Sequence, residues 1–468
     1  MEKNFDVIVI GSGPAGYVCA IRCSQLGLKT ACVESNQTLG GTCLNVGCIP
    51  SKSLLNSSEI YHKSKTDFEK LGIEIGNIKL NLSKMMQNKQ KSVLTLTKGI
   101  EFLFKKNKIT HLKGKGVISN KNTVDVIDFS GKKTNYKTKN IVIGTGSIAT
   151  SLPGIKIDEN IIVSSTGALS FEKIPKKMVV IGGGYIGLEL SSVWKRLGSE
   201  VTVIEFLDHI IPGMDRDISS EFLKILQKQG INFKLDQKVT EVNIVKDKAI
   251  VDFTNNKTGK RERIECDKVL VAVGRRSNIG EDLLKTGIKL DSNKKIKVNE
   301  KFETSIKNIY AVGDVINKGP MLAHKAEEEG IAIAEIIAGQ AGHVNYDVIP
   351  AVIYTSPEVA SVGKTEEQLK KENIKYKIGK FPFLANSRAK VNNETEGFVK
   401  IIADEKTDKV LGVSMISNMA GTMIAELALA MEFGASAEDI ARTCHAHPTH
   451  NEAVKEAAMA VDKRPIHF

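Results

Sequence analysis

The chain has 468 residues, of which 41% are hydrophobic and 26% are charged, an ordinary balance for a globular protein. This length allows three or four compact units, and no apolar run approaches the roughly 18 residues typical of a membrane span. The net charge of +12 suggests an anionic partner, but acidic residues are mixed among the basic ones and aromatic residues are only 5%, so we expect a solvated Lys-rich surface and no nucleic-acid or membrane partner.

The first predicted strand, residues 5–10, begins almost at the first Met, which leaves no room for a targeting peptide. We therefore expect a cytoplasmic protein, or an organellar one that has already been processed. Five of the seven cysteines lie outside the motif described below and lack the spacing of a zinc site. In a reducing compartment we expect them to be buried small side chains that bind no metal. They are Cys19, Cys23, Cys32, Cys266 and Cys444.

Residues 6–34 predict a strand, a glycine-rich turn, a helix and a second strand. Gly11, Gly13 and Gly16 form a GxGxxG turn, and Glu34 ends the second strand. The glycines permit a tight turn and close approach of the backbone to a pyrophosphate, while the glutamate suits a ribose diol.

The next motif, GGTCLNVGCIPSK at residues 40–52, places Cys43 and Cys48 five residues apart. An undistorted α-helix would separate their Cα atoms by about 8.6 Å, whereas a disulfide needs Cα atoms within roughly 7 Å. If the two cysteines pair, the backbone between them must be tightened, which Asn45 and Gly47 permit. Such a pair beside an electron carrier indicates a redox centre.

Residues 82–106 predict a polar helix, and residues 112–147 alternate apolar and polar side chains, which predicts β-structure. Residues 178–205 then repeat the first unit at a constant offset of 171, with Glu205 in the place of Glu34. A lone GxGxxG is weak evidence, but two in the same context, each with its acid, predict two dinucleotide sites. Strand-plus-glycine phrases at 269–276 and 309–315 and a helix at 324–338 follow, and the pattern changes from about residue 347.

Over essentially its whole length, the chain resembles the flavin-dependent pyridine nucleotide–disulfide oxidoreductases. The decisive phrases are residues 40–52, 311–315 and 444–452, the last reading CHAHPTHNE. Within that family, residues 319–330 and 354–363 are similar to the dihydrolipoamide dehydrogenase subfamily. The resemblance implies an α/β fold with two Rossmann-like dinucleotide-binding domains and an α+β C-terminal dimerisation domain. The implied division is 1–148 and 276–346 for the FAD-binding domain, 149–275 for the NAD-binding domain and 347–468 for dimerisation.

The resemblance also implies which residues bind each cofactor. For FAD they are Gly11, Gly13, Gly16, Glu34, Gly41, Thr42, Lys52, Gly116, Thr145, Gly146, Ser147, Asp314, Met321, Ala323 and His324. For NAD they are Gly182, Gly184, Gly187, Glu189, Glu205, Val239 and Gly274. Glu205 would repel a 2′-phosphate and residues 206–208 contain no Arg to receive one, so we expect NAD rather than NADP.

The implied activity is oxidation of dihydrolipoamide by NAD⁺ through a Cys43–Cys48 disulfide and FAD. Cys43 is implied to exchange with the substrate and Cys48 to face the flavin, and the chemistry requires a thiolate of lowered pKa. His447 is implied as the acid–base residue, because imidazole titrates near neutral pH, with Glu452 orienting its ring. Lys52 is implied to pair with Glu189 near the flavin.

His445 and His450 lack the following Pro of the motif, and we expect them to be supporting or exposed residues. In the family, the active-site His comes from the partner subunit, which implies a homodimer with a shared active site. The subfamily also serves 2-oxo acid dehydrogenase complexes, where it meets a lipoyl-bearing acyltransferase. Those partners often dock through basic surfaces, so the positive charge of this chain argues against simple charge complementarity.

Two alternatives remain open at this point. One is a different disulfide reductase that works with NADPH. The other is a non-catalytic scaffold subunit, which predicts a damaged redox motif, although the motif residues are all present. They are Cys43, Cys48, Lys52, His447 and Glu452.

Overall fold

The computed structural model describes residues 3–468, which form two compact units. The first comprises the chain up to Leu54, Ser83–Thr150 and Gly274–Val344, and the second comprises Leu55–Leu82, Ser151–Val273 and Asn345–Phe468. The division into four segments made from the sequence stays a prediction. Across the described residues, no helix is both long and apolar enough to cross a membrane.

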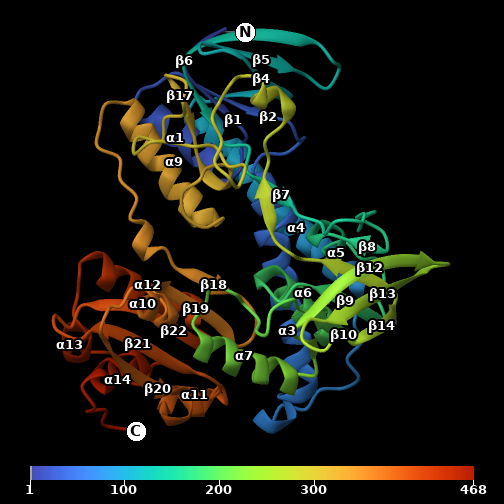
Figure 1. Cartoon of the computed structure of the whole chain (residues 1–468), viewed down its shortest axis with the longest axis vertical. Coiled ribbons are helices and arrows are strands. Elements are labelled where there is room, and N and C mark those ends of the chain that lie inside the picture. The colour runs from blue at the N-terminus through green and yellow to red at the C-terminus, as the bar shows by residue number, and fades with distance from the viewer. Residues whose placement is uncertain (1–2) are drawn as a thin grey trace. The chain divides into compact units, whose positions relative to one another are not determined.

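A seven-stranded sheet forms the centre of the first unit (Figure 1). Five strands run parallel in the order β3-β2-β1-β6-β17, and β5 and β4 extend β6 as an antiparallel hairpin. Val7, Ile8 and Val9 are consecutive and fully buried, so both faces of the sheet are covered. The strands are β1 Asn4–Ile10, β2 Thr30–Glu34, β3 Thr110–Lys113, β4 Lys115–Asn120, β5 Thr123–Ile127, β6 Lys133–Ile143 and β17 Ile309–Ala311.

Two helices of the first unit, α1 (Pro14–Gln25) and α9 (Ala323–Ile337), pack against each other. Their approach is close because Gly330 has no side chain: a Cβ there would lie 2.7 Å from the carbonyl oxygen of Ala15. The predicted helices at 82–106 and 324–338 are confirmed, the first with the predicted bounds. The other elements are α2 Gly41–Val46, α3 Cys48–Thr66, which begins in this unit, α4 Leu82–Lys106, α8 Glu281–Leu284, η2 Gly313–Val315 and the antiparallel pair β7 Ser147–Ala149 and β16 Arg275–Ser277.

The second unit contains a five-stranded parallel sheet in the order β11-β10-β9-β15-β8. A three-stranded antiparallel sheet, β12-β13-β14, packs on it, and every second residue of β13 (Ala249, Val251 and Phe253) is buried against Val179 and Val269. The elements are η1 Glu69–Leu71, β8 Ile162–Val163, α5 Ser165–Ala168, β9 Lys177–Ile181, α6 Tyr185–Leu197, β10 Glu200–Ile204, α7 Arg216–Lys228, β11 Asn232–Lys234, β12 Gln237–Val245, β13 Lys248–Asn255, β14 Arg261–Cys266 and β15 Lys268–Val271.

The C-terminal part of the second unit is a five-stranded antiparallel sheet in the order β18-β19-β22-β21-β20, with helices packed on it (Figure 1). Helix α14 lies close to β20, since a Cβ on Gly379 would be 2.0 Å from the carbonyl oxygen of Ala457. The elements are η3 Tyr346–Val348, β18 Ala351–Ile353, β19 Glu358–Gly363, α10 Glu366–Lys371, β20 Tyr376–Pro382, η4 Phe383–Ala385, α11 Ser387–Asn392, β21 Phe398–Asp404, β22 Val410–Ser417, α12 Ala420–Glu432, α13 Ala437–Arg442 and α14 Glu452–Val461.

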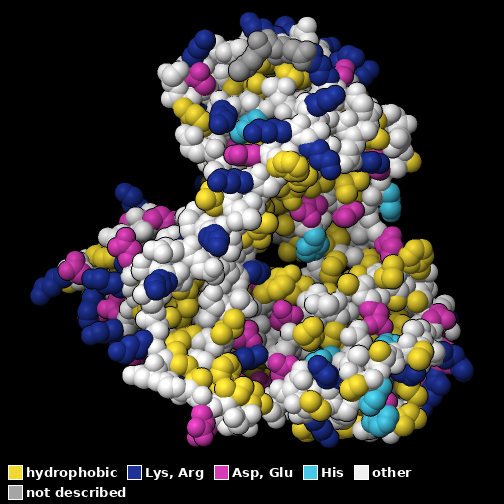
Figure 2. All heavy atoms as spheres, turned by 180° about the vertical axis from the view of Figure 1, so that it is seen from behind, with side chains coloured by type: hydrophobic (Ala, Val, Ile, Leu, Met, Phe, Trp, Pro, Cys, Tyr) yellow, Lys and Arg dark blue, Asp and Glu magenta, His cyan; other side chains and the backbone are white. Residues whose placement is uncertain are grey.

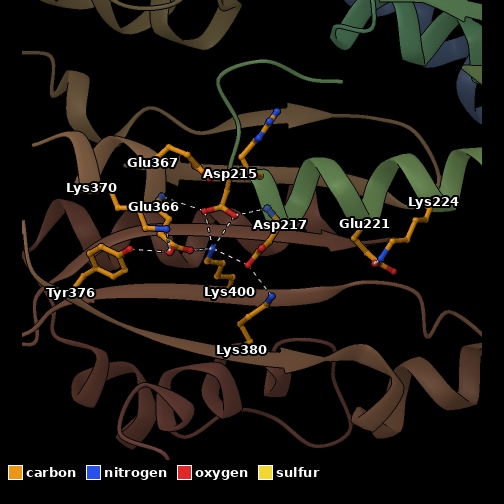
Figure 3. A network of polar contacts seen from close by, with 11 residues as sticks. Asp215, Asp217, Glu221, Lys224, Glu366, Glu367, Lys370, Tyr376, Lys380 and Lys400 are labelled. Atoms are coloured by element: carbon orange, nitrogen blue, oxygen red, sulfur yellow. Dashed lines mark hydrogen bonds and ion pairs between the residues drawn. The ribbon is translucent and has the colours of Figure 1, made fainter. Parts of the chain in front are cut away.

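A buried ion cluster links this C-terminal sheet to the N-terminus of α7 (Figure 3). The side chain of Lys400 on β21 is 1% exposed. Its Nζ atom lies 2.9 Å from both carboxylate oxygens of Asp215, 3.1 Å from Asp217 and 2.8 Å from Glu366. Asp215 also caps α7 by accepting the Asp217 N–H, so one cation fixes the start of this helix on the sheet.

Lys and Arg side chains are spread over several parts of the face drawn in Figure 2, with Asp and Glu between them. Of the five cysteines expected to be buried, Cys19, Cys23, Cys32 and Cys266 are buried. The expectation is wrong for Cys444, which is exposed because it lies in the loop between α13 and α14.

Candidate active site

The glycine-rich turn between β1 and α1 forms a backbone cradle. Gly11 has a φ of 101°, and a Cβ on Gly16 would lie 1.9 Å from the Gly11 carbonyl oxygen, so neither position has room for a side chain. Helix α1 begins after Gly13 with no side-chain cap and no acidic residue in its first turn. Its first N–H groups are therefore available to an anion, and the cradle fits a pyrophosphate.

Glu34, at the end of β2, is 4% exposed and is fixed in place by the turn. One carboxylate oxygen accepts the Ser12 N–H at 3.0 Å and the Ser12 hydroxyl at 2.5 Å. The other accepts the Asn36 N–H at 2.8 Å. These donors keep the carboxylate in the position where the motif expects a ribose.

The second unit repeats this arrangement at the level of single hydrogen bonds. Glu205 accepts the N–H of Gly183 at 2.6 Å and that of Leu207 at 2.9 Å. Gly183 and Leu207 lie 171 positions after Ser12 and Asn36, whose N–H groups donate to Glu34. Helix α6 likewise begins with no side-chain cap and no acidic residue in its first turn. Both units therefore fit a dinucleotide with a free ribose diol.

The chain between Cys43 and Cys48 is distorted, as the sequence predicts. Helix α2 ends at Val46, the next residue Gly47 is not helical, and α3 begins at Cys48. A Cβ on Gly47 would lie 2.9 Å from the carbonyl oxygen of Thr42. The Asn45 amide donates to two preceding backbone carbonyls at 2.8 and 3.0 Å. This break brings the two sulfur atoms into hydrogen-bonding contact as thiols.

The pKa of the Cys43 thiol is raised, first by the hydrogen bond with Cys48 and then by burial. The charge of the nearby Glu327 carboxylate adds to this rise, so Cys43 is not the thiolate of lowered pKa that the chemistry requires, and that requirement stays a prediction for Cys48. A cation does act on the other thiol: the Arg275 guanidinium interacts electrostatically with Cys48 and with Asp314. Negative charge is thus stabilised on the Cys48 side of the pair.

Arg275 belongs to a polar network that the sequence did not predict. It donates from Nε to the Ser147 hydroxyl at 2.7 Å and from Nη2 to the Ser147 carbonyl at 2.6 Å. The Ser147 hydroxyl donates to Asp314 at 2.6 Å, and Ser277 donates to the Asp314 carbonyl at 2.9 Å. Ser147 and Asp314, both predicted flavin residues, are thus in contact. The sequence offered one signal for this network, because Arg275 directly follows Gly274, a residue already predicted to bind a cofactor.

A buried ion pair, also not predicted, fixes the turn that carries Asp314. The side chains of Lys325 and Glu329 on α9 are 1% and 0% exposed, and their charged atoms lie 3.0 Å apart. Glu329 accepts the N–H of Gly313 at 2.8 Å, and Lys325 donates to the Gly313 carbonyl at 3.1 Å. Gly313 has a φ of 82°, a conformation that glycine adopts readily, and the ion pair holds it there by hydrogen bonds to its N–H and its carbonyl.

The structure brings His447 and Glu452 together in the second unit. The His447 Nδ1 atom lies 2.9 Å from Glu452, whose other oxygen accepts the Thr449 N–H at 2.9 Å. Burial raises the pKa of Glu452, but the Thr449 and His447 hydrogen bonds outweigh it and lower the pKa overall. The His447–Pro448 bond is cis, and the imidazole is 72% exposed. The ring is thus oriented by a carboxylate and open to a reactant.

The predicted Lys52–Glu189 pair stays a prediction. Lys52 lies on α3 in the first unit, whereas Glu189 lies buried on α6 in the second and accepts the Tyr354 N–H at 3.0 Å. The other residues predicted for FAD lie in the first unit: Gly11, Gly13, Gly16, Glu34, Gly41, Thr42, Gly116, Thr145, Gly146, Ser147, Asp314, Met321, Ala323 and His324. Of the residues predicted for NAD, Gly274 lies in the first unit. The others lie in the second unit: Gly182, Gly184, Gly187, Glu205 and Val239.

Comparison with protein families decides the assignment. The model described as pyridine nucleotide-disulphide oxidoreductase matches residues 5–330, and the model for the dimerisation domain of these enzymes matches residues 349–458. The chain belongs to the pyridine nucleotide-disulphide oxidoreductases. The family assignment, the predicted α/β fold class with its dimerisation domain and the predicted cofactors, FAD and NAD, are confirmed.

Relatives of this oxidoreductase match it over almost its full length. The mitochondrial dihydrolipoyl dehydrogenase of Pisum sativum is 54% identical over 464 residues, which cover 99% of this chain and 92% of the relative. The dihydrolipoamide dehydrogenase of Chaetomium thermophilum is 56% identical over 469 residues, which cover 100% of this chain and 93% of the relative. The crystal structure of LpdA from Mycobacterium tuberculosis shares the fold, with a TM-score of 0.89, 22% identity and coverage of 97% and 99%.

These relatives confirm the prediction that this oxidoreductase is an enzyme of the dehydrogenase type. They do not support the predicted cytoplasmic location, because the Pisum sativum relative is named as a mitochondrial enzyme.

Proposed function

We propose that this oxidoreductase is a dihydrolipoyl dehydrogenase, which oxidises dihydrolipoamide to lipoamide and reduces NAD⁺ to NADH. One observation carries the proposal: a chain that matches enzymes of that name over its full length retains the Cys43/Cys48 thiol pair beside a dinucleotide cradle. The duplicated cradle supports two dinucleotides with different tasks. Glu205, anionic and already fixed by two N–H donors, supports NAD⁺ over a coenzyme with a 2′-phosphate.

The thiol chemistry begins with a Cys43–Cys48 disulfide. A substrate thiolate attacks the sulfur of Cys43, the bond to Cys48 breaks, and Cys48 leaves as a thiolate beside Arg275. The second substrate thiolate then attacks the substrate sulfur of this mixed disulfide, which releases lipoamide and leaves both cysteines reduced. Bound FAD supplies the two-electron transfer from the cysteine pair to NAD⁺, which becomes NADH.

His447 accepts the protons that the substrate thiols lose. The Glu452 carboxylate on Nδ1 fixes the tautomer, so that Nε2 is the basic atom, and stabilises the charged ring. Cys43 is released last as a thiolate, and because its pKa is raised it takes up a proton, which the protonated His447 donates. A histidine beside Cys43 both removes a proton from the substrate and returns one to the enzyme.

We further propose that the chain acts as a homodimer in which His447 serves the cysteines of the partner subunit. The matching dimerisation domain supports a dimer. Lys52 and Glu189 form an ion pair near the flavin in this proposal, as the family resemblance implies. The lipoyl-bearing acyltransferase of a 2-oxo acid dehydrogenase complex is the proposed partner. The chain works in the cytoplasm or in an organelle, and fractionation of its source cells distinguishes the two.

The test is anaerobic addition of dihydrolipoamide to the holoenzyme, followed in visible absorption, and then addition of NAD⁺, followed as NADH. Wild type should develop a long-wavelength thiolate–flavin absorption and form NADH, with NADP⁺ much less effective. Cys48→Ser should lose both signals, while Cys444→Ser, which alters an exposed thiol in the loop of His447 but outside the redox motif, should keep them. Reduction of glutathione disulfide but no reaction with dihydrolipoamide would overturn the proposal.

A further inference from the structure

The loop that carries His447 is held by one carboxylate, which contacts it at a residue before His447 and at a residue after it. Glu426 lies on α12, and its Oε1 atom is 2.8 Å from Nε2 of His445. Its Oε2 atom accepts the side-chain amide of Asn451 at 2.6 Å. A single residue, Ala446, separates His445 from His447, and Asn451 directly precedes Glu452, the partner of His447. Glu426 therefore contacts the loop before and after the imidazole.

The surroundings of His445 require a charged ring. Its Nδ1 atom lies 2.9 Å from the carbonyl oxygen of Thr443, and its Nε2 atom faces the carboxylate of Glu426. Both neighbours are acceptors, so both ring nitrogens must carry a proton. The side chain is 5% exposed, which leaves the carboxylate as its counter-ion.

Electrostatics agree with this geometry. The Glu426 hydrogen bond raises the pKa of His445, whereas burial and the charge of Lys455 on α14 lower it by less. Burial raises the pKa of Glu426, but the hydrogen bonds from His445 and Asn451 outweigh it and lower the pKa overall. Both shifts favour the ionised pair that the geometry requires. As the pH rises through the raised pKa of His445, the ring loses one proton and one of its two contacts.

We infer that Glu426 is a positioning residue for His447, which it holds through an ion pair with His445 and a hydrogen bond with Asn451. His445 and Asn451 are the two ends of one clamp. The inference deepens the proposed function, on which it rests, since it explains how an imidazole that is 72% exposed keeps one orientation.

The test compares Glu426→Gln with Glu432→Gln, the same substitution on the same helix at an exposed residue that contacts Asn345. Glutamine at 426 offers one acceptor oxygen, so its NH₂ group must face one of the two former donors. We expect dihydrolipoamide turnover by the holoenzyme to fall about 10-fold, a fraction of what a displacement of 1 Å can cost. Reduction of ferricyanide by NADH needs no imidazole and should not change. Glu432→Gln should match wild type in both assays.

A second measurement does not depend on turnover. The chain has nine histidines, and NMR of the ¹³C-histidine-labelled holoenzyme resolves the titration of His445, which is assigned by its loss in His445→Asn. We expect its midpoint to lie above the ordinary 6.5 in wild type and to fall in Glu426→Gln. A loop that is merely packed would show no such shift.

The outcomes separate the inference from the proposed function. If wild type fails to oxidise dihydrolipoamide, the proposed function is wrong, and the inference fails with it unless His447 lies beside another substrate. If wild type is active but Glu426→Gln keeps its turnover and the His445 midpoint, only the inference is overturned. Equal loss of turnover and ferricyanide reduction would also overturn it, because it indicates general unfolding. Should Glu426→Gln not fold, Asn451→Ala removes the hydrogen bond between Asn451 and Glu426 instead. Turnover of Asn451→Ala equal to that of wild type would then overturn the inference.

Discussion

Lys400 has an ammonium group that is removed from water yet lies within 3.1 Å of Asp215, Asp217 and Glu366 (Figure 3). Burial lowers the pKa of Lys400, but the hydrogen bonds to Glu366 and Asp215 together outweigh it and raise the pKa overall. Removing one member of such a cluster leaves uncompensated buried charge, which typically costs 3–5 kcal/mol.

We therefore predict that Lys400→Met lowers the free energy of unfolding by about 3–5 kcal/mol. Lys380→Met is the matched control, because Lys380 contacts Asp217 from an exposed position, and exposed pairs contribute about 0–1 kcal/mol. Denaturant unfolding of the second unit measures both. Equal destabilisation by the two variants would contradict the buried-charge argument.

The same cluster predicts a dependence on pH. Burial raises the pKa of Glu366, but hydrogen bonds from Lys370, Lys400 and Tyr376 outweigh it and lower the pKa to about 2, from an ordinary 4.5. A carboxyl with a lowered pKa stabilises the fold above pH 4.5, and this contribution is lost as the pH falls towards 2. The difference in the free energy of unfolding between wild type and Lys400→Met should therefore shrink as the pH falls from 4.5 towards 2. An advantage that stays constant would show that Glu366 is not coupled to Lys400.

At the level of elements, helix α9 supports the turn η2 through two buried side chains. Lys325→Met leaves Glu329 buried without its cation, and the Gly313 carbonyl loses a donor. Asp314 follows in the same turn and contacts Ser147, so loosening the turn disturbs a predicted flavin residue.

We predict that Lys325→Met raises the dissociation constant of FAD by about 10-fold or more, as expected for the loss of a hydrogen bond to a charged group. Recovery of flavin fluorescence on dilution measures the release. Glu335→Gln, on the same helix and paired with the half-exposed Arg22, should release FAD like wild type. The double variant Lys325→Met/Glu329→Leu should recover much of the thermal stability, because it buries no unpaired charge. A double variant as unstable as the single one would contradict an electrostatic cause.

Elements with local signals were predicted well. Helix α4 has the predicted bounds, and the offset of 171 places the donors to Glu205 as it places those to Glu34. Both follow from periodicity and glycine spacing, which are readable within about 30 residues.

The buried clusters were missed for a physical reason. Lys400 and Asp215 are 185 positions apart, and nothing in either local sequence marks the partner. Lys325 and Glu329 are four apart on α9, a spacing that usually indicates an exposed helix pair, so only the fold reveals their burial. The raised pKa of Cys43 could not be predicted either, because its direction depends on Cys48 and Glu327, whose distances the sequence does not give.

At the scale of the whole molecule, the proposed chemistry needs groups from both units. The thiol pair belongs to the first unit and His447 to the second. In the proposed dimer each active site combines the cysteines of one subunit with His447 of the other. A two-fold axis makes the two sites equivalent, so each subunit gives its cysteines to one site and its imidazole to the other.

This arrangement predicts that two inactive variants restore activity when their subunits exchange. Cys48→Ser and His447→Ala homodimers should each lack dihydrolipoamide turnover. In a random mixture half of the dimers are heterodimers, and each has one site with both lesions and one intact site, so about a quarter of wild-type activity should return. Separate tags on the two variants allow the heterodimer to be purified, and its activity should be about half that of wild type. If Cys43, Cys48 and His447 acted within one chain, every site in the heterodimer would carry a lesion. A purified heterodimer without turnover would therefore refute the shared site, while leaving the wild-type reaction intact.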